Sequence, residues 1–158
     1  MVDEDLHRRC VSAWMERVDT GSPPEPLLRA FEQAFAALWL RAHRTLGEVT
    51  LAAVVERVLS RASDRYPVLS PLEVGPAGLR CDGLLARAGS ARHERLAEGI
   101  RFVLVELLTV LGNLTADILT PALHAELSKA ATDAGRAAKS RKASPRAAKA
   151  ATMRKRTS

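Results

Sequence analysis

The chain has 158 residues, 47% of them apolar and only 4% aromatic, which suits one domain with an aliphatic core of packed helices. Residues 1–133 hold all 18 acidic residues and 15 of the 24 Lys and Arg, so they carry a net charge of −3, whereas residues 134–158 hold nine cations and no acid. The sequence has no glycine-rich phosphate loop, nucleophile elbow or Cys/His cluster, so we expect a non-enzymatic protein without a metal or cofactor.

Membrane and secretory segments are not predicted. The most apolar stretch, Phe102–Leu111, is about half the length of a membrane span and contains Glu106. Three of the first five residues are acidic, whereas a secretory signal begins with basic residues followed by an apolar stretch. The two cysteines, Cys10 and Cys81, are predicted to be reduced thiols in a cytoplasmic protein.

Two amphipathic helices are predicted first along the chain. The first covers residues 3–19, because apolar side chains repeat every four residues at Leu6, Cys10, Trp14 and Val18. A connector rich in Pro and Gly follows, and the second helix covers 25–46 and ends at Gly47. Its apolar residues recur at three- and four-residue steps: Leu27, Leu28, Phe31, Phe35, Leu38, Trp39 and Leu46.

A third helix is predicted over residues 49–65, with an apolar stripe of Leu51, Val54, Val55, Val58, Leu59 and Ala62. Pro67 ends it and opens an irregular Pro/Gly-rich insertion over 67–83. This insertion is either a hairpin, with 72–74 paired to 79–81 across a four-residue loop, or an irregular packed loop. Asp82 is placed to cap a short helix over 83–88.

The longest predicted helix covers residues 91–119 and is central, because Ile100–Leu111 is apolar nearly all round. A break at Gly112–Asn113 is the alternative. A last helix is predicted with Thr120 as its N-cap and Pro121 at its first position, ending near Ala131. The fold class predicted is therefore all-α, a bundle of four to five main helices.

The tail over residues 134–158 lacks Leu, Ile, Val and aromatic residues, so we expect it to be disordered when free. Its runs KSRKASPR (139–146) and AAKAA (147–151) resemble the basic tails of histone H1-type proteins in composition. The resemblance implies binding to phosphates of nucleic acid, with duplex DNA favoured and little sequence preference. The predicted nucleic-acid-binding residues are Arg136, Lys139, Arg141, Lys142, Arg146, Lys149, Arg154, Lys155 and Arg156.

Other partners of the tail stay open at this point. A basic tail is also attracted to acidic proteins or membrane surfaces, or serves only to keep a protein soluble. In a eukaryote the run 154–156 would also suit nuclear import. The Ala-, Arg- and Leu-rich composition is more typical of a high-GC bacterium, in which a DNA-bound protein would be associated with the nucleoid.

The alternative function is a bacterial signalling adaptor or phosphotransfer-like domain. His43 followed by Gly47 is similar to the signature of histidine-containing phosphotransfer domains. That family has Lys before the Gly, whereas this chain has Leu46, and His43 falls at the end of its predicted helix. The two facts favour a surface histidine.

Two further expectations concern the helical domain. Glu106 is an acid within an apolar stretch, and we expect it to pair with an Arg of another helix, the alternative being a functional carboxylate. Neither His7 nor His124 has a neighbour at metal-ligand spacing. Finally, a thin bundle is expected to leave part of an aromatic patch uncovered, which would favour a homodimer through the first two helices or contact with another protein. The patch consists of Trp14, Phe31, Phe35 and Trp39.

Overall fold

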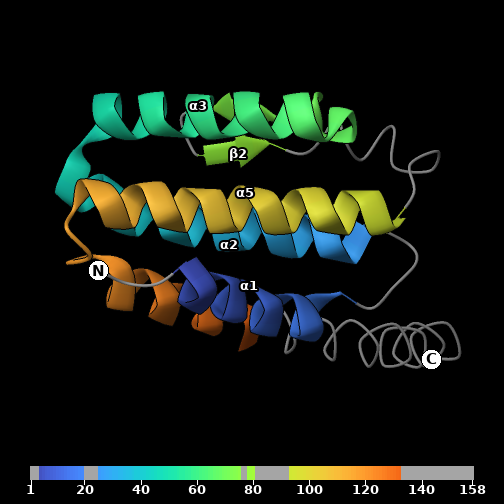
Figure 1. Cartoon of the computed structure of the whole chain (residues 1–158), viewed down its shortest axis with the longest axis horizontal. Coiled ribbons are helices and arrows are strands. Elements are labelled where there is room, and N and C mark those ends of the chain that lie inside the picture. Colours follow the sequence, from blue (N-terminus) through green and yellow to red (C-terminus); the bar gives the residue numbers. More distant parts are fainter. Residues whose placement is uncertain (1–3, 20–24, 76–77, 81–92, 133–158) are drawn as a thin grey trace, which may run out of the picture.

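The fold is an all-α bundle, as predicted, seen in a computed structural model (Figure 1). The described residues are 4–19, 25–75, 78–80 and 93–132. The long helix α5 (His93–Leu114) runs through the middle of the bundle, with α3 (Glu48–Arg65) along one side and α1 (Glu4–Val18) along the other. Helix α2 (Glu25–Leu46) packs behind α5, and a final helix over 120–132 lies beside α1.

Helix α1 buries a face slightly rotated from the predicted one. Leu6 was expected to point inward, but its side chain is 45% exposed, and His7 is buried instead. The buried positions His7, Val11, Trp14 and Val18 follow a four-three-four spacing, which also defines one face of a helix. The rotation therefore brings a titratable ring into the interior.

Helices α2 and α3 confirm their predicted ranges to within one residue. The valines of α3 do not form a strand, because their spacing places Val55 and Val58 on the buried face of a helix. Gly47 joins the two helices with a φ of 81°, in the left-handed region that favours glycine.

The predicted uncovered aromatic patch is not present on α1 and α2. Trp14, Phe31 and Phe35 are buried inside the bundle, and only Trp39 is partly exposed, stacked on Phe35. The expectation failed because α5 packs along both of the first two helices and covers their apolar faces. Trp39 is what remains of the expected patch, and the dimer through the first two helices stays a prediction.

The insertion after α3 contains a small hairpin, the first of the two predicted alternatives. A 3₁₀ turn (η1, Pro67–Leu69) leads to β1 (Glu73–Gly75), which pairs antiparallel with β2 (Gly78–Arg80). The connection is two residues shorter than expected, because Gly75 and Gly78 pair with each other. Leu69 is fully buried against α5, where the lack of a side chain at Gly99 leaves it room.

Helix α5 ends at Leu114, five residues earlier than the main prediction and close to the alternative break. Ala116 and Asp117 take positive φ angles of 50° and 62°, so the helix cannot continue through them. The Asp117 amide then donates to the carbonyl oxygen of Gly112 at 2.7 Å. Seven of the twelve residues from Ile100 to Leu111 are buried, which agrees with the predicted central place of this helix. The other five are the exposed Arg101 and the partly exposed Phe102, Glu106, Thr109 and Val110.

The final helix begins at residue 120, one position before the predicted first residue Pro121. The Leu119 carbonyl accepts the first bond of this helix, from the amide of Leu123. The Thr120 hydroxyl donates to the carboxylate of Asp117 at 3.3 Å. Thr120 lies within the helix rather than at the predicted N-cap position, where its side-chain oxygen would accept a bond from a helix amide. Leu123 and Leu127 are fully buried, as expected from their spacing.

Candidate functional site

Several predicted features fall outside the described residues. They are Cys81, the short helix over 83–88 and its cap Asp82, and the nine cations of the tail. The site geometry below therefore concerns the helical domain.

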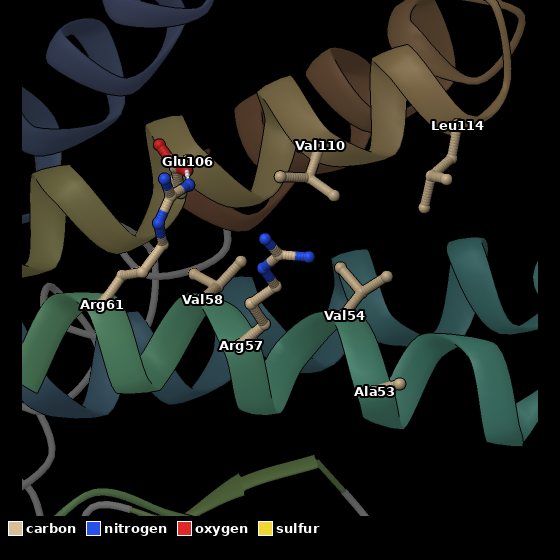
Figure 2. Close-up of a pocket in the computed structure, with 8 residues that line it drawn as sticks. All are labelled: Ala53, Val54, Arg57, Val58, Arg61, Glu106, Val110 and Leu114. Carbon is tan, nitrogen blue, oxygen red and sulfur yellow. Dashed lines mark hydrogen bonds and ion pairs between the residues drawn. The ribbon is translucent and has the colours of Figure 1, made fainter.

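A groove of about 350 Å³ lies between α3 and α5 (Figure 2). Its walls are mainly apolar, with two arginines and one glutamate among the lining residues: Ala53, Val54, Arg57, Val58, Arg61, Glu106, Val110 and Leu114. The groove is about half enclosed, and its apolar lining includes the partly exposed Val54 and Val110 and the buried Val58.

Helical periodicity explains how the two walls arise. On α3, Ala53, Arg57 and Arg61 are spaced by four residues and so share one face. On α5, Glu106, Val110 and Leu114 have the same spacing. Because the two helices run in opposite directions (Figure 1), the start of α3 lies beside the end of α5 and both apolar ends meet.

The charged end of the groove is closed by an ion pair. Arg61 donates to the carboxylate of Glu106 at 2.6 Å, which joins α3 to α5 and confirms the structural interpretation of Glu106. Beyond this pair, the guanidinium of Arg65 lies over the ring of Phe102, 5.4 Å from its centre. The charged surface therefore continues away from the apolar part of the groove.

Arg57 differs from its neighbour Arg61. Its guanidinium points across the groove toward α5, between Glu106 and Val110 (Figure 2). Within the part of the chain that the structure describes, no carboxylate forms an ion pair with it. The groove thus offers one cation without a counter-charge beside an apolar wall.

A second cluster joins α1 to the final helix. Nδ1 of His7 lies 2.9 Å from Nε2 of His124, and the rings meet edge to face with centres 5.1 Å apart. The thiol of Cys10 points at the carbonyl oxygen of His124, 4.0 Å away. Burial raises the pKa of the Cys10 thiol, so the thiolate needed for nucleophilic or metal chemistry is disfavoured.

Burial also lowers the pKa of both histidines. For His7 the desolvation of the charged ring outweighs the attraction of Asp117 and Glu4, and for His124 the nearby His7 adds to the effect of burial. Neutral rings suit the observed contact, in which one nitrogen donates and the other accepts. The described residues contain no group of three or more His, Cys, Asp and Glu placed to hold a metal ion.

The structure also places His43. It is exposed in the last turn of α2, and the helix ends three residues later at Leu46. The predicted position at a helix end is therefore confirmed, and this was one of the two facts that favoured a surface histidine.

Sequence reasoning missed both the groove and the histidine pair. His7 is 117 residues from His124, and no sequence spacing connects them. A usable signal was the register of His7 with Val11, Trp14 and Val18, which predicts that its side chain faces inward. Nothing in the sequence distinguishes Arg57 from the other exposed arginines of α3, so its place in the groove could not be predicted.

Within the described ranges, no helix has the length and apolar character needed to cross a membrane. Comparisons of the whole chain with known protein families, with curated proteins and with solved structures found no match in any of the three.

Proposed function

We propose that this chain is a non-enzymatic binding protein, in which the helical domain contacts a protein partner and the basic tail binds nucleic acid. The charge distribution is the observation that carries the proposal. Residues 134–158 have nine cations and no acid, whereas residues 1–133 have a net charge of −3. The attraction to a polyanion is therefore concentrated in one short segment.

The expected ligand is duplex DNA, bound with little sequence preference. Cations spread over a segment without Leu, Ile, Val or aromatic residues neutralise phosphates, but no predicted helix or strand of the tail would hold their side chains against base edges. Release of condensed counterions makes such binding fall steeply with salt. In a bacterial cell, this activity would associate an otherwise cytoplasmic protein with the nucleoid.

The test compares full-length chains on a random-sequence duplex over a series of salt concentrations. Replacing all nine tail cations by Gln should abolish the mobility shift and remove the salt dependence. A chain with a scrambled tail of the same composition is the matched control. It should bind the duplex as tightly as the natural chain, because the proposed binding depends only on the charge of the tail. Equal binding by the natural and the neutral tail would refute the proposal. Equal affinity for polyglutamate would show that the ligand is any polyanion rather than nucleic acid.

A further inference from the structure

We infer that the groove between α3 and α5 receives an amphipathic helix of a partner protein, with its apolar face on Val54, Val110 and Leu114 and a carboxylate on Arg57. This inference rests on the protein-binding half of the proposed function and is independent of the tail. It names the surface of the domain that is used and the chemistry of the partner.

The first argument is where exposed apolar side chains gather. The described residues expose five large ones, and two of them lie on the helices that form the apolar end of this groove: Leu114, 53% exposed, lines it, and Val49, 85% exposed, lies near the start of α3. Val49 is one turn before the groove-lining Ala53 on the same face of α3. Such a concentration of exposed apolar surface commonly marks an interaction site.

The second argument is the shape of the site. Small molecules are held in pockets that bury most of their surface, whereas this site is a trough only about half enclosed between two antiparallel helices. A trough of this kind accommodates a third helix, whose apolar residues at i, i+4 and i+7 lie along its floor. The volume of about 350 Å³ is enough for a few side chains of such a helix.

The third argument is charge. Arg61 is already neutralised by Glu106, but Arg57 points across the trough without a counter-charge among the described residues. A docked apolar helix would remove water from this guanidinium, which is unfavourable unless a carboxylate comes with the helix. The partner is therefore expected to carry Asp or Glu next to its apolar stripe.

A second copy of this chain fits less well. Outside this end of the bundle, the exposed large apolar residues in the described ranges are Leu6 and Leu40, one on α1 and the other on α2. Neither described helix offers two such side chains one turn apart, as a helix in the trough requires. The occupant is thus a helix of another protein.

The experiment selects ligands with the full-length protein as bait. The probe is a displayed library of helical peptides in which one face is randomised at i, i+3, i+4, i+7 and i+8. The selected peptides are expected to carry three large apolar residues and one Asp or Glu. Binding of a winning peptide, followed by fluorescence anisotropy, should weaken about tenfold or more in Arg57→Glu. The same peptide with Lys in place of its acid should bind Arg57→Glu better than it binds the natural chain.

Controls separate the groove from the rest of the molecule. Arg9→Glu makes the same change of charge at an exposed position of α1 that does not line the groove, and it should leave peptide binding unchanged. Val110→Asp should abolish peptide binding, with its folding checked by circular dichroism and melting. Each variant should still shift DNA, so loss of the tail function and loss of the groove function are distinguishable.

Other outcomes would overturn the inference. Winning peptides without an acid, or peptides that bind the natural chain and Arg57→Glu equally, would remove the role of Arg57. A dimer seen by light scattering for the natural chain, and a monomer for Val110→Asp, would identify a second copy as the occupant. Shifts of the Val54 and Val110 methyl resonances on adding decanoate, without selection of any peptide, would identify a small amphiphile.

Discussion

His7 on α1 and His124 on the final helix approach within 2.9 Å, although they are 117 residues apart in the chain. His7 is only 2% exposed, and the contact lies where the first and last helices of the domain meet. One ring must donate and the other accept, so the arrangement requires at least one neutral imidazole. Placing a positive charge on both rings would lose the hydrogen bond and bring two cations together.

The pair makes stability dependent on pH. Because the pKa of each histidine is lowered from 6.5 by burial, the unfolded chain takes up protons that the folded chain excludes. The free energy of unfolding should be constant well above pH 6.5 and should fall as the pH drops below it. Asp117 and Glu4 act in the opposite direction on His7 and make the loss smaller. Melting curves measured from pH 8 to pH 5 check this.

The control for that experiment removes both rings at once. Replacing both His7 and His124 by Leu removes the whole hydrogen bond, so no buried ring nitrogen is left without its partner. The double variant should show a smaller pH dependence of the melting temperature. Replacing the exposed His43 by Gln should leave the pH dependence as it is. If the double variant keeps the full pH dependence, other groups are responsible for it.

Leu107→Ala should destabilise the domain by roughly 2–5 kcal/mol, because it leaves a cavity in the middle of the core. The side chain is 2% exposed on the central helix α5. Leu114→Ala on the same helix is the matched control, since that side chain is 53% exposed, and it should cost less than about 1 kcal/mol. Urea unfolding of both variants measures the difference. Similar losses for the two would show that α5 is not the core helix.

Gly112→Ala should destabilise the domain by about 1 kcal/mol, although alanine is the better helix former by about that amount. A Cβ atom at this position would lie 2.9 Å from a carboxylate oxygen of Asp117 and 3.1 Å from the hydroxyl oxygen of Thr120. The exposed neighbour Asn113 provides the control, because Asn113→Ala gains helix propensity without meeting buried atoms. A higher melting temperature for Gly112→Ala than for the natural chain would contradict the close approach of Asp117 and Thr120 to Gly112.

Deleting residues 134–158 should leave helicity and melting temperature nearly unchanged. The deleted segment has no Leu, Ile, Val or aromatic residue and so contributes little to a core. Circular dichroism of both chains measures the effect. A drop of more than about 4 °C, the shift that roughly 1 kcal/mol produces in a small domain, would show that the tail docks on the acidic domain.

The helices and the central place of α5 were predictable from local patterns in the amino-acid sequence. Apolar residues at three- and four-residue steps defined α2 and α3 to within one residue, and the apolar run Ile100–Leu111 identified the most buried helix. The charge division near residue 133 is also a property of the sequence alone. These features were predictable because period and composition act over a few neighbouring residues.

The end of α5, the histidine pair and the groove depend on contacts between segments that are far apart in the chain. The chain turns after Leu114, and the turn brings Asp117 and Thr120 back onto Gly112. His7 faces inward because α1 is rotated to place His7, rather than Leu6, against the final helix. Packing also decides that Arg61, and not Arg57, pairs with Glu106, which leaves Arg57 without an ion pair among the described residues. These features follow from how whole helices rotate and pack against one another. That packing depends on residues far apart in the chain, so local sequence patterns do not reveal it.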